Sequence, residues 1–243
     1  MNQSLESTLV LCDLDNLLLG ADGNLTQVVR DVLQLFSSRG GRFTVFSQRS
    51  PRAVRSILGS VRLAAPALVC GGTMAYHYAD GTTRVLRMSN ALERHLQQEW
   101  TPYLLANAAD IKGENVLRVL LYQDSKAVPM VSLLGKALGD RTAVLLGERA
   151  APDTLLLTPK TVSGKEMLDA VCGPAGVEPE NVLVLAGGMP MLELVRAASR
   201  SAAAADAPAE LRLAAQNVTL TDASAGAAVE VLYRMVRDAE KSV

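Results

Sequence analysis

The chain has few aromatic residues, few cysteines and no long apolar run. Its 243 residues include one Trp, five Tyr and three Phe, so Leu, Val and Ala have to form most of the core. Cys12, Cys70 and Cys172 are odd in number, far apart and without metal-binding spacing, which argues against a disulfide framework. No apolar run reaches the roughly 18 residues that span a bilayer, so no membrane association is expected.

An excess of charge of one sign is also missing. Lys and Arg total 24 and Asp and Glu total 25, which gives a formal net charge of −1. This balance argues against nucleic acid and anionic membranes as partners. Residues 1–11 carry no basic segment ahead of an apolar stretch, so we expect a cytoplasmic location. With 49% apolar residues, the chain is predicted to fold as one large globular domain or two modest ones.

Short apolar runs alternate with amphipathic stretches in the first 70 residues. The predicted order is a strand at Ser7–Cys12, a polar loop at Asp13–Asn24, a helix at Thr26–Ser38, a strand at Arg42–Phe46, a helix at Pro51–Leu58 and a strand at Ala67–Cys70. Such an alternation is typical of an α/β fold with a doubly wound, Rossmann-like parallel sheet.

The pattern changes near residue 76 and resumes near residue 163. Tyr76–Met88 is predicted to be a hairpin that begins a different unit. That unit is expected to contain helices at Ala91–Ala108 and Val128–Leu138 and strands at Asn115–Tyr122, Thr142–Leu146 and Thr154–Leu157. After Ser163, helices are expected at 163–171, 191–199, 208–214 and 225–241, and strands at 181–185, 202–205 and 217–220. We therefore predict a core domain of residues 1–85 and 161–243 with an inserted α/β cap domain, 86–160.

Two carboxylates follow the first predicted strand, at Asp13 and Asp15. Ligands of open parallel sheets bind at the carboxyl ends of the strands, so polar residues at these positions are candidates for a site. One carboxylate could attack an electrophile or bind a metal while the other transfers a proton. An Asx turn at Asp15 and Asn16 explains the same residues without function.

Further candidates follow the second strand and open the helix after the insertion. Ser47, Gln48 and Arg49 provide a hydroxyl, backbone N–H groups and a cation that suit a phosphate, although a serine before a helix is also an ordinary cap. Lys165 lies at a helix N-terminus, against the helix dipole, and is a candidate anion ligand or a plain surface residue. His77 has no partner at metal or triad spacing and is predicted to be structural, as is His95.

The order of these residues resembles the haloacid dehalogenase (HAD) superfamily. The likeness rests on Asp13-Leu14-Asp15, Ser47, Lys165 and a glycine turn after the strand at 181–185. An α/β insertion after the third strand is similar to the cap of the Cof-type branch. Ala205–Glu210 and Asn217-Val218-Thr219 resemble the C-terminal segments of that branch. The resemblance implies a HAD-like core with a cap.

The resemblance also implies a phosphatase for a small phosphorylated metabolite. Asp13 would attack phosphorus to form an aspartyl phosphate, and Asp15 would protonate the leaving oxygen and then activate water. Ser47 and Lys165 would hold the phosphoryl oxygens. Mg²⁺ would be bound by Asp13, the backbone carbonyl of Asp15 and an acid of the last motif, because Mg²⁺ prefers oxygen ligands.

The last motif departs from the family pattern. Gly-Asp, two residues and Asn-Asp are expected, whereas the chain reads Gly187-Gly188-Met189-Pro190-Met191-Leu192. Gly188 and Leu192 therefore replace both metal-side acids. Glu193 is the nearest acid that could complete a metal site, although one residue along a helix turns a side chain by about 100°. We expect Mg²⁺ to be bound weakly or not at all.

Two functions remain open at this point. The first is a HAD-type phosphatase with an impaired Mg²⁺ site, and the retained Asp13, Asp15, Ser47 and Lys165 favour it. The second is a catalytically inactive relative that binds a phosphorylated ligand or a partner protein, and the loss of the acids at Gly188 and Leu192 favours it.

Overall fold

The computed structural model describes residues 5–49, 51–86, 119–122, 142–146, 154–159 and 162–241. The two helices predicted between residues 91 and 138 lie outside the described residues, as does His95. Among the described residues, no helix has the length and apolar character that a bilayer span requires.

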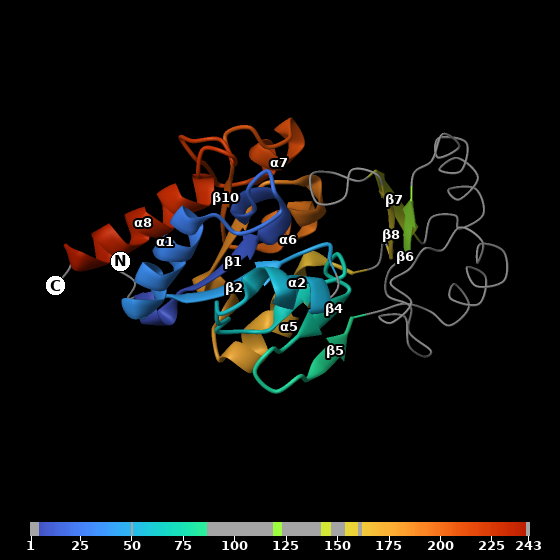
Figure 1. Cartoon of the computed structure of the whole chain (residues 1–243), viewed down its shortest axis with the longest axis horizontal. Helices are drawn as coiled ribbons and strands as arrows, with labels where there is room; N and C mark the ends of the chain where they lie inside the picture. Colours follow the sequence, from blue (N-terminus) through green and yellow to red (C-terminus); the bar gives the residue numbers. More distant parts are fainter. Residues whose placement is uncertain are drawn as a thin grey trace.

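Eight strands form one central sheet in the order β11-β10-β9-β1-β2-β3-β4-β5 (Figure 1). The pairings from β11 to β3 are parallel, and those of β4 and β5 are antiparallel. The strands are β1 (Leu9–Asp13), β2 (Arg42–Phe46), β3 (Ala67–Val69), β4 (Met74–Tyr76), β5 (Thr83–Val85), β9 (Val182–Ala186), β10 (Arg200–Ala203) and β11 (Asn217–Val218).

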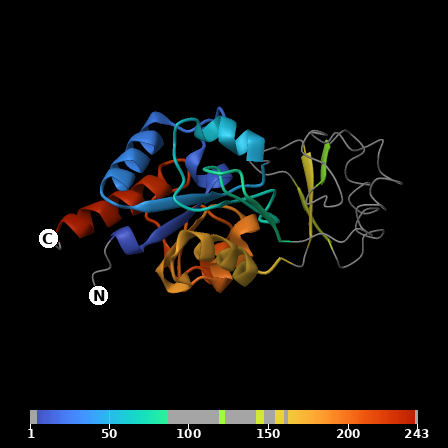
Figure 2. The same cartoon turned by 90° about the horizontal axis from the view of Figure 1, so that it is seen from below.

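Helices cover both faces of this sheet. They are α1 (Gln27–Ser38), α2 (Pro51–Leu58), α5 (Gly164–Ala175), α6 (Leu192–Ala197), α7 (Ala209–Ala214) and α8 (Ala227–Glu240), with short turns η1 (Leu5–Ser7), η5 (Pro179–Asn181) and η6 (Met189–Met191). On one face α1 packs against α8, and on the other α5 packs against α6 (Figure 2). The predicted doubly wound α/β fold is confirmed.

The strand order reverses at β1. The chain runs outward through β2 and β3 and later returns to the other side of β1 with β9 and β10. In sheets of this kind, ligands bind beyond the carboxyl ends of the strands at the reversal. The topology therefore places the candidate site at the ends of β1, β2 and β9.

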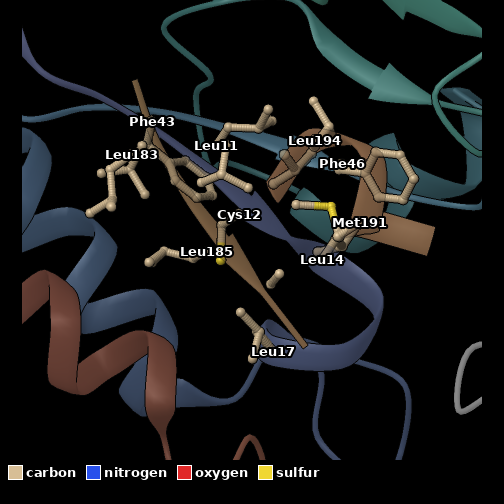
Figure 3. Packing of buried hydrophobic residues seen from close by; sticks show 14 of the residues in the cluster. Leu11, Cys12, Leu14, Leu17, Phe43, Phe46, Leu183, Leu185, Met191 and Leu194 are labelled. Atoms are coloured by element: carbon tan, nitrogen blue, oxygen red, sulfur yellow. The ribbon is translucent and has the colours of Figure 1, made fainter. Parts of the chain in front are cut away.

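Aliphatic side chains form the core, as the composition predicts. All five residues of β1 are buried. Leu11, Phe43 and Leu183, from three adjacent strands, belong to the same buried cluster as Leu194 of α6 (Figure 3). This packing fixes the strand ends on which the site is built.

Local sequence signals explain where α1 and α5 begin. The Thr26 side chain accepts a hydrogen bond from the Val29 N–H and caps α1. In α5, Ser163 and Glu166 form a reciprocal capping box. Both helix starts were predicted within one residue.

The hairpin after β3 differs from its prediction. β4 and β5 do not begin a separate unit but extend the main sheet, with Leu68 of β3 opposite Ala75 of β4. The chain reverses sharply because Gly71 and Gly72 have positive φ angles of 70° and 82°. The side chains of His77 and Asp80 pair at the tip of the hairpin, in agreement with a structural histidine.

The segment after β1 also differs from the polar loop that was predicted. Leu14–Leu18 (η2) forms one wide helical turn of π type. Leu14, Leu17 and Leu18 are buried, so the apolar residues of this segment hold it against the core. The turn positions the backbone immediately after Asp13.

β6 (Val119–Tyr122), β8 (Thr154–Pro159) and β7 (Thr142–Leu146) form a second, antiparallel sheet in that order. Among the described residues, their pairings involve only one another. The division into a core of residues 1–85 and 161–243 and a cap of residues 86–160 stays a prediction, because most of that insertion lies outside the described residues.

Candidate active site

Three strand ends bring the candidate residues together. Asp13 is the last residue of β1, Ser47 follows β2, and Gly187 follows β9. β1 pairs with both β2 and β9, so these ends are neighbours. Asp13, Asp15, Ser47 and Gln48 are all buried. The sequence prediction that these side chains converge therefore agrees with the geometry.

The carboxylate of Asp13 is surrounded by N–H donors. Its Oδ1 accepts from the Asn16 backbone N–H at 3.1 Å, and its Oδ2 accepts from the Asn16 side-chain amide at 3.0 Å. The same Oδ2 accepts from the backbone N–H groups of Gly187 at 3.3 Å and Gly188 at 3.1 Å. The glycine turn after β9 thus folds directly onto Asp13.

Burial changes the titration of this carboxyl group. Desolvation, reinforced by the negative charge of Asp15, raises the pKa of Asp13 to about 7, and the hydrogen bonds from Asn16 and Gly187 oppose the shift. Asp13 therefore exists in both protonation states near neutral pH. The ionised form is the nucleophilic one.

Asp15 has different partners, all from the loop after β2. Its carboxylate accepts from the Ser47 hydroxyl at 3.0 and 3.2 Å, from the Gln48 backbone N–H at 2.6 Å and from Arg49 Nε at 2.9 Å. The Asp15 side chain is 1% exposed, whereas that of Arg49 is 25% exposed. Breaking such a pair by removing one partner would leave a charge poorly compensated.

Lys165 does not join this cluster. It is exposed on α5, and within the described residues no hydrogen bond or ion pair links it to Asp13 or Ser47. The buried neighbour is Gly164, where an added Cβ would lie 1.8 Å from the Glu193 carbonyl oxygen. Because successive helix positions differ by about 100°, burying Gly164 turns Lys165 toward solvent. The expectation that Lys165 contacts Asp13 is therefore not met.

Glu193 does not face the site either. It is exposed on α6 and pairs with Arg196 at 3.1 Å, and Arg196 also pairs with Glu210 at 2.9 Å. Its expected role as a substitute metal ligand is therefore not supported.

The residues present do not fit a Mg²⁺ ion. Both oxygens of Asp13 already accept N–H groups, and Gly188 offers a donor where an acid would be needed. Within the described ranges, no group of three or more His, Cys, Asp or Glu side chains could hold a metal. A hard dication requires several oxygen ligands, and this site presents mainly N–H groups.

Sequence reasoning missed one contributor to the site, Asn16. Asn16 was considered only as part of an Asx turn around Asp15, but its amide groups bind Asp13 instead. The backbone N–H of Gln48, rather than its side chain, contacts Asp15. A polar residue three positions after a strand-end Asp is the one signal that pointed to Asn16.

Comparisons with known proteins show which family the chain resembles. Residues 10–126 match the model of the haloacid dehalogenase-like hydrolases. Over these residues, the chain is similar to the haloacid dehalogenase-like hydrolases. The likeness to the Cof-type branch of the HAD superfamily, inferred from the sequence, is confirmed. None of the curated proteins searched matches the sequence.

Solved structures of HAD hydrolases share the fold across almost the whole chain. A haloacid dehalogenase-like hydrolase from Bacteroides thetaiotaomicron has 19% identity and a TM-score of 0.75, covering 94% of this chain and 99% of its own. A putative HAD/COF-like hydrolase from Plasmodium vivax has 14% identity and a TM-score of 0.76, covering 96% of each chain. A HAD phosphatase from Bacteroides thetaiotaomicron has 15% identity and a TM-score of 0.68, also covering 96% of each.

Proposed function

We propose that this HAD-fold chain binds a small phosphorylated molecule beyond the ends of β1 and β2 and does not catalyse rapid Mg²⁺-dependent hydrolysis. The observation that carries this proposal is the surroundings of Asp13. N–H donors from Asn16, Gly187 and Gly188 take both of its oxygens, in place of the cation that phosphoryl transfer requires.

The chain retains the donors that suit the ligand. The Ser47 hydroxyl, the Gln48 backbone N–H and the Arg49 guanidinium converge on one point at the end of β2. Charge-assisted hydrogen bonds of this kind are the strong ones for phosphate groups. Lys165, which is exposed on α5, takes no part in this proposal.

A slow phosphomonoesterase is the second candidate, favoured by the retained pair Asp13 and Asp15. In that reaction an Asp13 oxygen would form a bond to phosphorus as the ester oxygen leaves with a proton from Asp15. Water activated by Asp15 would then release phosphate from the aspartyl phosphate. For this, Asp15 must leave Ser47, Gln48 and Arg49, and Asp13 must give up N–H partners, so the barrier is high.

Metal dependence tests the proposal. We expect calorimetry to detect no tight Mg²⁺ binding to the natural chain and a generic phosphate ester to be hydrolysed at least about a thousandfold more slowly than by an efficient relative, since several kcal/mol of electrostatic stabilisation are absent. Changing Gly188→Asp together with Leu192→Asp adds two acids and should increase both Mg²⁺ affinity and turnover.

The Asp13→Asn variant of that double mutant is the matched control, because it removes the nucleophile and should abolish the gained turnover. Rapid Mg²⁺-dependent hydrolysis by the natural chain, lost on Asp13→Asn, would show the chain to be an efficient phosphatase and contradict the proposal.

A further inference from the structure

The loop after β2 already holds an anion, and that anion belongs to the protein itself. We call the Ser47 hydroxyl, the Gln48 backbone N–H and the Arg49 Nε–H the anion cradle. All three donate to the carboxylate of Asp15, at distances between 2.6 and 3.2 Å. The carboxylate uses both oxygens, with Oδ2 toward Ser47 and Gln48 and Oδ1 toward Ser47 and Arg49.

The cradle is built by the fold. Ser47 is fully buried, its backbone N–H donates to the Leu68 carbonyl at 2.8 Å, and its carbonyl accepts from the Gly71 N–H at 3.0 Å. The Ser47 hydroxyl oxygen also accepts from the Arg49 backbone N–H at 3.0 Å. The Ser47 hydroxyl therefore keeps its position whichever oxyanion it contacts, since backbone bonds to β3 and to the turn after it hold Ser47.

Carboxylate and phosphate groups compete for donors of this type. Both are oxyanions, and both accept bonds from backbone N–H groups, hydroxyls and a guanidinium. Phosphate has a higher charge and an additional pair of oxygens, so it can engage the same donors more completely. An external ligand cannot do so while Asp15 remains in place.

We propose that Asp15 is an internal competitor that occupies the anion cradle. A phosphate group binds there by displacing the Asp15 carboxylate from the cradle. This inference rests on the proposed function and adds to it how the site is regulated. The guanidinium of Arg49 then exchanges its hydrogen bond to Asp15 for one to the ligand. The Arg49 side chain is 25% exposed, which gives it room to move with an incoming anion.

Titration calorimetry with inorganic phosphate, on the full chain without metal, tests the inference. Asp15→Ala removes the competitor, and we expect it to bind phosphate at least about tenfold more tightly than the natural chain, because no internal group has to be displaced. Asp15→Asn has almost the same shape but no charge and should bind with intermediate affinity. Thermal unfolding of each variant, followed by circular dichroism, verifies that it is folded.

Two further variants identify the cause of any gain. Asp22→Ala removes one negative charge from the segment that follows η2. Asp22 is exposed, and its carboxylate accepts hydrogen bonds from the backbone N–H and the side-chain amide of Asn24. The variant should leave phosphate affinity unchanged within about twofold, as expected for a screened surface charge. Adding Arg49→Gln to Asp15→Ala should cancel most of the gain, because the cradle loses its cation.

The outcomes separate this inference from the proposed function. Equal, measurable phosphate affinity in the natural chain and in both Asp15 variants would overturn the internal competitor and leave phosphate binding intact. Weaker binding in Asp15→Ala and Asp15→Asn would overturn it as well, because Asp15 would then assist the ligand. No phosphate binding by any folded variant would overturn the anion cradle and the proposed function together.

Discussion

At the scale of single residues, Asp13 and Asp15 show how strongly surroundings decide the role of a carboxyl group. They are two positions apart, and both are buried. Asp13 is surrounded by uncharged N–H groups, whereas Asp15 pairs with the guanidinium of Arg49. The pKa of Asp13 rises to about 7, chiefly because burial disfavours its charged form.

The raised pKa predicts how Asp13 affects stability with pH. Between about pH 4 and pH 7 the folded chain keeps this proton while the unfolded chain has lost it, so the folded state binds more protons and stability falls as pH rises. Asp13 should thus stabilise the fold at low pH and lose this contribution as pH passes 7. Urea unfolding of the natural chain and of Asp13→Asn should give a difference in free energy that shrinks by about 2–4 kcal/mol across this range.

Asp80→Asn is the matched control for that experiment. Hydrogen bonds from Thr82 lower the pKa of Asp80 to about 2, so Asp80 stays ionised in both states above about pH 5. Its contribution is present above the ordinary pKa of 3.8 and is lost only as pH falls toward 2. A difference for Asp13→Asn that is as independent of pH as that for Asp80→Asn would mean that Asp13 is ionised throughout.

At the scale of elements, the contact between α5 and α6 depends on one glycine. A Cβ on Gly164 would meet the Glu193 carbonyl oxygen at 1.8 Å and the Ala197 Cβ at 2.8 Å. Gly164→Ala should therefore separate the helices and destabilise the fold by about 3 kcal/mol, at the upper end for overpacking. Lys165→Ala, one position away on the exposed side, should change the free energy of unfolding by less than about 0.5 kcal/mol. Chemical denaturation of both variants measures the contrast, and equal effects would show that α5 has a different rotation.

Gly164 and Lys165 also show which features of the fold could be predicted from the sequence. The start of α5 was predicted within one residue, and apolar periodicity located strands such as β2, whose bounds agree with the prediction. Periodicity did not show which position of the first turn faces α6, because glycine carries no hydrophobic signal. The structure places Gly164 at the buried position of this turn and Lys165 at an exposed one.

For the candidate site, the positions of the residues could be predicted from the sequence, but the directions of their side chains could not. Residues at the ends of adjacent parallel strands must meet, so the convergence of Asp13, Asp15 and Ser47 followed from the strand assignments. The direction of each side chain did not follow from them. The pairing of Asp15 with Arg49 and of Asp13 with Asn16 depends on the wide turn at η2. No sequence pattern predicted a turn of that type.

At the scale of the whole molecule, the described strands of the main sheet all lie outside the insertion. In the part of the chain that the structure describes, all strand pairs of this sheet join residues from 9–85 and 182–218, whereas β6, β7 and β8 pair only with one another. Leu86 and Val162 flank the insertion, and each is only 9% exposed, so the core remains packed at both points of departure. This arrangement predicts that the core is an independent folding unit.

Replacing residues 87–160 by a short Gly/Ser linker tests this prediction. Because the deletion removes no strand of the main sheet, we expect one cooperative thermal transition and a melting temperature within about 2–4 °C of the full chain, which corresponds to about 1 kcal/mol for a chain of this size. A deletion of residues 83–160 also removes β5, whose partner β4 then becomes an unpaired edge, and should melt at a lower temperature than the first variant. A shorter chain that lacks a cooperative transition would show that the core needs the insertion to fold, and that the boundaries at residues 85 and 161 do not separate domains.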